Sequence, residues 1–260
     1  MQRLKREIPN ILTLCNLLCG CLSIASTFEG RAAWAAVFIL VAAVFDLFDG
    51  MVARLLGVAG PLGKELDSLS DVVSFGVAPS FIAYDMVVSQ LVLPSWMGFI
   101  VLLMALASAY RLGKFNLDEE QKKDFKGMPT PANALFWAAL GLHWVKTGFV
   151  LDVYFILLLS ILMSLLLVSN FRMFSLKGGG WKWKSKRMVY LFFLLAIVLV
   201  CIFGFLGIAA SVVLYPVFSF LHFAFDRVKP AAIGTSESRR TPLDSRPAAG
   251  SPGSESQKEI

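Results

Sequence analysis

The sequence predicts an all-α fold, a polytopic transmembrane helical bundle of about eight spans. Hydrophobic residues make up 57% of the 260-residue chain and charged residues only 16%, and the mean hydropathy is +0.70. These values exclude an ordinary soluble globular domain. Each crossing needs about 20 apolar residues, and suitable runs lie at 11–28, 33–56, 65–88, 95–113, 131–147, 150–169, 188–206 and 208–226.

The first apolar run follows a basic N-terminus, so it could be a retained span or a cleaved signal peptide. Ser23 and Ala25 would serve as a cleavage site of small residues. However, polar Asn10, Thr13 and Asn16 interrupt the run, which is unusual for a signal-peptide core. We therefore expect this segment to be retained as the first span.

Basic residues predict how the bundle is oriented, because cytoplasmic loops carry an excess of Lys and Arg. If successive loops alternate between the two sides, all but two of the 24 basic residues fall on one side. Only Arg31 and Lys146 fall on the other. Both termini are therefore expected in the cytoplasm, and the net charge of +6 needs no nucleic-acid partner to explain it.

Composition divides the chain into two parts. Residues 1–229 contain all the predicted spans and should form one membrane domain. Residues 230–260 are rich in Pro, Ser, Gly, Ala and Arg and lack apolar periodicity, so burial cannot offset the entropy lost on ordering. We expect them to form a disordered cytoplasmic tail.

Four carboxylates lie within the second and third apolar runs, at Asp46, Asp49, Asp67 and Asp71. A charge at the centre of a membrane helix costs roughly 2.5–3.5 kcal/mol, so four of them require a reason. Spacings of three and four residues place each pair on one helix face, and cations would relieve the repulsion between the carboxylates. All-oxygen ligation suits hard divalent metal ions such as Mg²⁺ or Mn²⁺.

Small residues and one cation accompany these carboxylates in the segment DLFDGMVARLLGVAGPLGKELDSLSD. Gly50, Ala53 and Gly63 allow a bulky nucleotide or another helix to approach closely, and Arg54 can bind phosphate. The pattern predicts a site that holds a diphosphate through two metal ions. Alternatively, intramembrane aspartates could pair with basic residues, line a water-filled pore or bind a transported ion.

From Asp49 to Asp71 the residues fit DG(x)2AR(x)8G(x)3D(x)3D. With Asp46 three residues upstream, this pattern resembles the signature of the CDP-alcohol phosphatidyltransferase family. The resemblance implies a homodimeric helical membrane bundle in which the site opens toward the cytoplasmic face. That position agrees with the orientation predicted from charge.

The resemblance also implies roles for individual residues. The metal ligands would be Asp46, Asp49, Asp67 and Asp71, and Asp71 would also be the general base on the acceptor hydroxyl. The CDP group would contact Gly50, Ala53, Arg54 and Gly63. Asn10 and Thr13, in the motif PNILT, would touch the diphosphate or, alternatively, cap a helix at the membrane edge.

Further segments resemble the membrane-embedded bacterial phosphatidylserine synthases within this family. They are IPNILTLCNLLCGCLSIA, SDVVSFGVAPS, RLGKFN and FKGMPTPANA; the third departs from the expected RLARFN at Gly113 and Lys114. The resemblance implies that the protein transfers the phosphatidyl group of CDP-diacylglycerol to L-serine and releases CMP. It also implies residence in the bacterial cytoplasmic (inner) membrane, with the active site facing the cytoplasm.

Serine is zwitterionic, so its site needs a cation for the carboxylate and an acceptor for the ammonium group. Arg111, Lys114 and Lys126 are candidates for the first task, although each could equally be a charge that sets topology.

Three other functions remain open. One is transfer to glycerol 3-phosphate or inositol phosphate, which would require a tighter basic cluster near the site. A second is divalent-cation transport through the acidic cluster, which would leave Arg54 and the glycine spacing unexplained. A third is a scaffold that binds CDP-lipid and releases no CMP.

Overall fold

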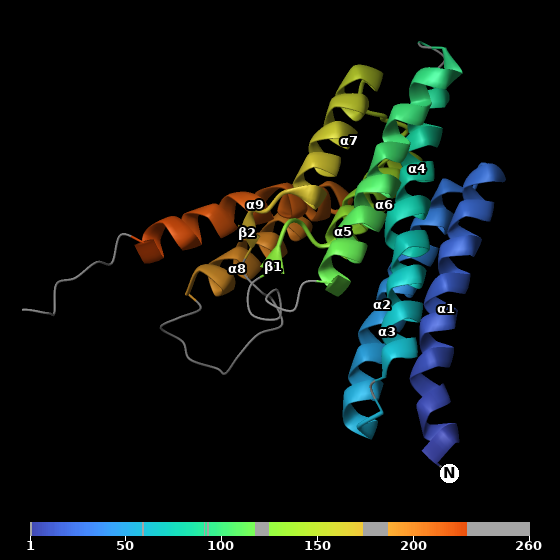
Figure 1. Cartoon of the computed structure of the whole chain (residues 1–260). Coiled ribbons are helices and arrows are strands. Elements are labelled where there is room, and N and C mark those ends of the chain that lie inside the picture. The colour runs from blue at the N-terminus through green and yellow to red at the C-terminus, as the bar shows by residue number, and fades with distance from the viewer. Residues whose placement is uncertain are drawn as a thin grey trace, which may run out of the picture.

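The structure is a computed structural model, and it describes residues 2–227 except 59, 91, 93, 118–124 and 174–186. The expected tail, 230–260, lies outside the described residues. Helices dominate the described part (Figure 1). They are α1 (Gln2–Phe28), α2 (Ala32–Leu56), α3 (Pro61–Asp71), the π-helix η1 (Val72–Val77), α4 (Ala78–Val88), the 3₁₀-helix η2 (Ser95–Leu102), α5 (Leu103–Leu117), α6 (Thr130–Thr147), α7 (Val153–Val168), α8 (Arg187–Phe203) and α9 (Phe205–Arg227).

Each of the eight predicted spans coincides with a helical segment, since α3, η1 and α4 run on as one segment and η2 continues into α5. The all-α prediction is therefore confirmed for the described residues, with one small exception. Two-residue strands β1 (Phe125–Lys126) and β2 (Arg172–Met173) pair antiparallel. The sequence analysis did not predict them.

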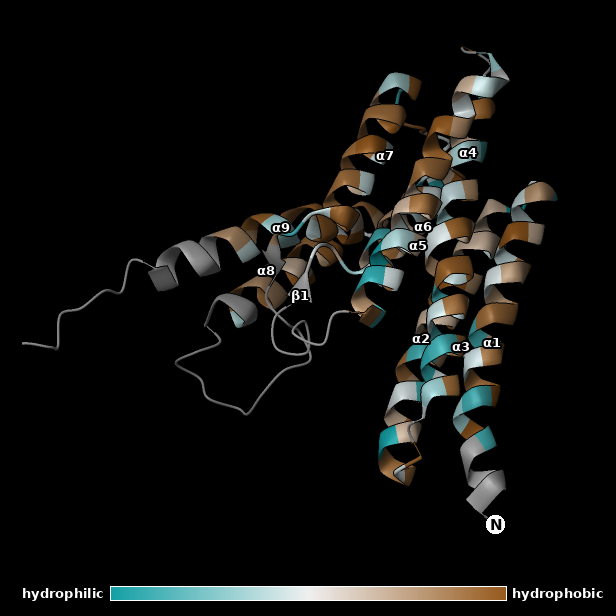
Figure 2. Ribbon diagram, in the orientation of Figure 1, coloured by the Kyte–Doolittle hydropathy of each residue, from teal (hydrophilic) through white to brown (hydrophobic). Residues whose placement is uncertain are grey.

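Four segments are long and apolar enough to cross a membrane: Glu7–Phe28, Ala32–Leu56, Pro61–Val88 and Trp96–Leu117. Shorter apolar helices follow at Val153–Val168, Tyr190–Phe203 and Phe205–Phe220. Figure 2 shows hydrophobic residues along much of the length of the helices. These features are those of an integral membrane protein. In Figure 1, α8 and α9 run crosswise to α1–α4, an arrangement that the hydropathy pattern did not predict.

The turn between α2 and α3 follows from its glycines and proline. Gly57 ends α2 in the left-handed conformation (φ 62°), which costs glycine little. The N–H of Gly57 donates to the carbonyl of Arg54, and that of Val58 donates to the carbonyl of Ala53, so two carbonyls in the last turn of α2 are satisfied. Pro61 then begins α3, where its missing N–H costs nothing. The turn brings the two carboxylate-bearing segments back toward each other.

Two glycines let helices pack directly against η1. A Cβ on Gly20 would lie 2.8 Å from the Cα of Ser74, and a Cβ on Gly76 would lie 2.9 Å from the Cβ of Ser108. α1 and α5 can therefore approach η1 only because these positions lack side chains. The Ser74 hydroxyl also donates to the Asn16 carbonyl at 2.9 Å. π-Helices are rare and often occur at functional sites, and this one begins directly after Asp71.

The segment that enters α6 is attached to the end of α7. The N–H of Gly127 donates to the carbonyl of Phe171 (2.8 Å), and that of Met128 donates to the carbonyl of Leu166 (3.1 Å). Gly127 has a φ of 77°, and a Cβ there would lie 2.6 Å from the carbonyl oxygen of Leu167. The start of α6 is thus fixed by backbone contacts that only glycine permits.

Gly127→Ala is therefore expected to destabilise the protein strongly. The left-handed backbone alone costs a non-glycine residue roughly 1–2 kcal/mol, and the overlap with the Leu167 carbonyl adds to that cost. Gly148→Ala is the matched control, because Gly148 has a φ of 71° and open space around the added Cβ. Thermal melting in detergent should show a clearly larger drop for Gly127→Ala; equal drops would contradict the proposed overlap.

Candidate active site

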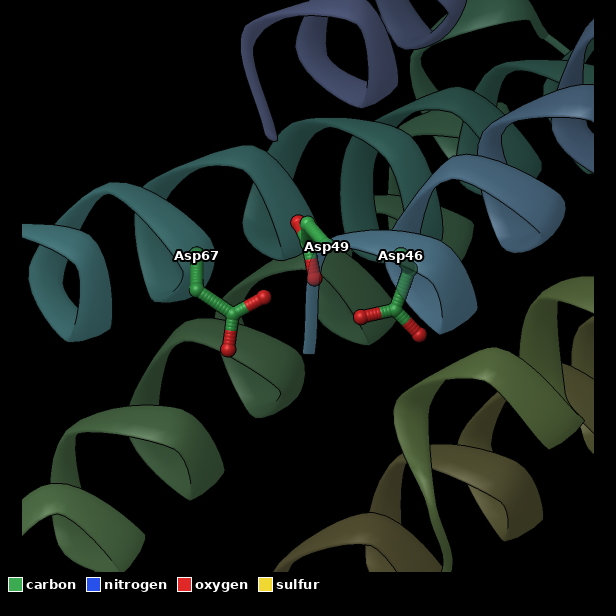
Figure 3. Close-up of side chains that lie close together, drawn as sticks. All are labelled: Asp46, Asp49 and Asp67. Carbon is green, nitrogen blue, oxygen red and sulfur yellow. The ribbon is translucent and has the colours of Figure 1, made fainter. Parts of the chain in front are cut away.

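Three carboxylates converge between α2 and α3. Ligand oxygens of Asp46 and Asp49, on α2, and of Asp67, on α3, all lie within 4.8 Å of one another. Figure 3 shows the carboxylates of Asp46 and Asp67 pointing toward each other across the space between the two helices. Both helices pack against α1, whereas they approach each other much less closely. The acidic side chains therefore line the space left between α2 and α3.

Helix α1 supplies hydrogen bonds to these carboxylates. The Thr13 hydroxyl donates to Oδ2 of Asp49 at 2.7 Å, and Nδ2 of Asn16 donates to Oδ1 of Asp71 at 3.3 Å. Ser70 Oγ in turn donates to the Thr13 carbonyl at 3.1 Å. Thr13 and Asn16 are three residues apart and share one helix face. Both hydrogen bonds restrict how the two carboxylates can rotate.

Asp71 is buried and lies outside the set of three mutually close carboxylates. It remains close enough to Asp46, Asp67 and Asp49 for electrostatic interaction. The largely buried Arg111 also interacts electrostatically with Asp71. Asp71 thus interacts with both an acidic cluster and a cation, an environment that differs from that of the three clustered aspartates.

The three clustered carboxylates fit a hard divalent cation. Their donors are all oxygens, which Mg²⁺ and Mn²⁺ prefer, and they lie as close together as ligands of one ion or of two neighbouring ions would. Asp49 is 5% exposed, so placing its charge near two others would be unfavourable without a counter-charge. The acidic cluster could therefore hold divalent metal.

The residues predicted to contact the CDP group lie around the ends of α2 and α3. A Cβ on Gly50 would meet no other atom within 4 Å, whereas a Cβ on Gly63 would lie 3.3 Å from Oδ1 of Asn10. Arg54 is exposed, and its Nε donates to the Gly50 carbonyl at 2.8 Å. Ala53 is half-buried. The structure brings Gly63 and Asn10 together, while Gly50 and Arg54 adjoin each other.

Two of the predicted cations have described side chains, and they differ in burial. Arg111 is 9% exposed, whereas Lys114 is exposed and its Nζ donates to Oδ1 of Asn170 at 2.8 Å. The side chain of Lys126 lies outside the described residues. A small pocket adjoins Arg111 and Lys114, and it is lined by Tyr110, Arg111, Lys114, Leu167, Val168, Ser169 and Asn170.

Asn16 was not predicted from the sequence to belong to the site. Its signal was nonetheless present, because Asn16 is a polar residue in an apolar run and lies one turn after Thr13. Its partner, Asp71, is 55 residues away, and no local pattern could have identified that pairing.

Comparison with known proteins identifies the family. The CDP-alcohol phosphatidyltransferase profile matches residues 6–167, well over half of the chain. The chain is 40% identical over 124 residues to CDP-diacylglycerol–serine O-phosphatidyltransferase of Bacillus subtilis, which covers 48% of this chain and 69% of the relative. It is 33% identical over 199 residues to the enzyme of that name from Helicobacter pylori, covering 73% and 81%. Archaetidylserine synthase of Methanothermobacter thermautotrophicus is 37% identical over 131 residues, covering 49% and 54%.

The matched region contains the acidic cluster, Asp71 and Arg111, and α8 and α9 follow it. Divalent-metal dependence is typical of the family, in agreement with the oxygen donor set of the cluster. The resemblance predicted from the spacing of the aspartates is therefore confirmed, and the protein belongs to the CDP-alcohol phosphatidyltransferase family.

Proposed function

We propose that the protein transfers the phosphatidyl group of CDP-diacylglycerol to L-serine, giving phosphatidylserine and CMP. The observation that carries this proposal is the convergence of the three carboxylates of Asp46, Asp49 and Asp67, with the buried Asp71 oriented by Asn16 and the buried Arg111 within electrostatic reach of it. A diphosphate held at the cluster and a carboxylate bound by Arg111 would place an acceptor hydroxyl near Asp71. Relatives named for serine transfer support the choice of acceptor.

In this mechanism the serine hydroxyl attacks the phosphorus that bears the diacylglycerol. Asp71 accepts the hydroxyl proton. A new oxygen–phosphorus bond forms, the bond from that phosphorus to the CMP oxygen breaks, and CMP leaves. Asn16, which donates to Oδ1 of Asp71, would leave the other carboxylate oxygen to receive the proton. Bound divalent metal would supply charge stabilisation for the phosphoryl oxygens.

The donor lipid would be held by residues of α1, α2 and α3. We assign metal binding to Asp46, Asp49 and Asp67, with Asp71 as a fourth ligand when substrate is bound. The exposed Arg54 would bind phosphate. Gly50, Ala53 and Gly63 would leave room for the CDP group, with Asn10 and Thr13 near the diphosphate. The adjacency of Gly63 and Asn10 supports a shared role for these two.

The acceptor carboxylate is assigned to Arg111. A guanidinium can bind a carboxylate with two parallel hydrogen bonds, and Arg111 lies beside the proposed base. Lys126, on the segment attached to the end of α7, is a second candidate.

The arrangement in the membrane follows from charge and from the family. We propose that residues 1–229 form the membrane domain, that 230–260 are a cytoplasmic tail, and that both termini are cytoplasmic. The active site would then lie in the bacterial inner membrane and face the cytoplasm. Serine is available on that side. A homodimer is proposed from the resemblance.

The test is CMP release from CDP-diacylglycerol by the detergent-purified protein with Mg²⁺ or Mn²⁺. L-serine, glycerol 3-phosphate and inositol phosphate are offered separately. Release that depends on serine is expected. Release with another acceptor would preserve the mechanism but show that serine is not the substrate. If no acceptor gives CMP release with either metal, the enzymatic function is contradicted.

A further inference from the structure

Several polar side chains on α5 and α6 are buried without hydrogen-bond partners among the described residues. Asn133 is fully buried, and neither its Oδ1 nor its Nδ2 has a partner. Thr130 is 1% exposed and its hydroxyl is also unpartnered, as is Nε of Arg111. A buried polar group without hydrogen bonds costs folding free energy and therefore calls for an explanation. Asn133 is the strongest case, since a whole amide is unsatisfied.

Contacts with α3 and η1 fix the height of Arg111 on α5. Asn116 Nδ2 donates to Ser68 Oγ at 2.8 Å. Nearer the start of α5, Ser108 lies against Gly76, with 2.9 Å between its Cβ and the position of a Cβ on the glycine. The two segments are thus antiparallel. Arg111 lies between these contacts, so it is level with the first turn of η1.

A contact with α4 fixes the height of α6 in the same way. A Cβ on Gly141 would lie 3.0 Å from Cγ2 of Ile82, and α6 runs parallel to α4 because successive spans alternate in direction (Figure 1). Thr130 precedes Gly141 by as many residues as Asp71 precedes Ile82 (141 − 130 = 82 − 71 = 11). Thr130 is therefore level with Asp71, and Asn133 lies one turn further along.

Helices α5 and α6 approach each other much less closely than they approach η1, which is the segment they share as a neighbour. Both α5 and α6 pack against η1, and α6 also packs against α2 and α9. Arg111 interacts electrostatically with both Asp71 and Tyr215 of α9. The unpartnered side chains thus occur on two helices that flank the same segment, at the height of the proposed base.

We propose that Asn133 and Thr130 complete the acceptor pocket and bind the ammonium group of the amino acid. The Oδ1 of Asn133 and the hydroxyl oxygen of Thr130 would accept hydrogen bonds from the ammonium, while Arg111 binds the carboxylate. The polar atoms of Asn133 and Thr130 that have no partner in the free protein would then be the atoms that bind the ammonium group. The inference rests on the proposed function, because it specifies how that acceptor is recognised.

The test compares Asn133→Leu and Thr130→Val, which keep approximate shape and remove the polar atoms, with the full-length wild-type protein. The KM for L-serine is expected to rise at least tenfold in each, since a hydrogen bond to a charged group is lost. The KM for CDP-diacylglycerol should stay within threefold. The melting temperature should be unchanged or higher, because an unsatisfied buried polar group has been removed.

Ser160→Ala provides the control. Ser160 is also fully buried, but its hydroxyl donates to the Leu157 carbonyl of its own helix at 2.8 Å, so neither KM should change. An unchanged serine KM in Asn133→Leu would overturn the inference, as would a lowered melting temperature with equal rises in both KM values, which indicates a structural role. If the wild-type protein transfers the phosphatidyl group to another acceptor and not to serine, the proposed function itself is wrong. That result is distinguishable from an unchanged serine KM in the variants.

Discussion

Asp71→Asn is expected to lower kcat by at least 100-fold while changing the affinity for CDP-diacylglycerol less than tenfold. A positioned general base contributes about 10² to 10⁴ in rate, and asparagine cannot accept the serine proton. Asp71 lies outside the set of three mutually close carboxylates, which would still hold metal without it, so loss of this fourth ligand should weaken donor binding much less than it slows turnover. Steady-state CMP release and equilibrium binding of CDP-diacylglycerol measure the two effects.

Asp85→Asn is the matched control for this substitution. Asp85 is half-buried in α4, in the same continuous helical segment as Asp71 but 14 residues further along (85 − 71 = 14), which corresponds to about 20 Å. Its kcat should be that of the wild-type protein. Comparable losses of turnover and of donor affinity in Asp71→Asn would contradict the assignment of Asp71 as the base.

Removal of divalent metal is expected to abolish turnover and lower the melting temperature. Two unit charges 4.8 Å apart repel by roughly 3.5 kcal/mol at an effective dielectric constant of 20, and three carboxylates make three such pairs. A chelator should therefore expose repulsion that bound metal offsets. Melting curves and CMP release with chelator, then with added Mg²⁺ or Mn²⁺, measure both effects.

Asp49→Asn tests whether the cluster binds metal, as distinct from an effect on the overall stability of the protein. This substitution removes one charge from the cluster but can keep the hydrogen bond from Thr13. The variant should require more than tenfold more metal for half-maximal activity, and chelator should lower its melting temperature less than that of the wild-type protein. An identical metal requirement in the two proteins would show that the cluster is not the metal site.

The helical class and the acidic cluster were predictable because both have strong local signals. Runs of apolar residues predict helices directly, and aspartates three or four residues apart must share a helix face. The π-helix was not predictable, since VVSFGV reads as ordinary helix. It occurs where Gly20 and Gly76 permit two other helices to approach, and such tertiary packing leaves no local pattern.

The other features that could not be predicted from the sequence depend on contacts between residues far apart in the chain. The strands β1 and β2 have two residues each, too few for an alternating pattern. Asn133 could be recognised as polar, but its lack of partners becomes evident only when the surrounding helices are in place.

The hydrogen bonds from α1 have a consequence for turnover. Thr13 and Asn16 each engage one oxygen of a carboxylate, and the close contact between Gly20 and Ser74 prevents α1 from sliding along its neighbour. The direction in which each carboxylate presents its remaining oxygen is therefore set when the protein folds. If these carboxylates form the proposed site, little reorganisation should be needed when the donor lipid arrives, and the site would be electrostatically preorganised before each catalytic cycle.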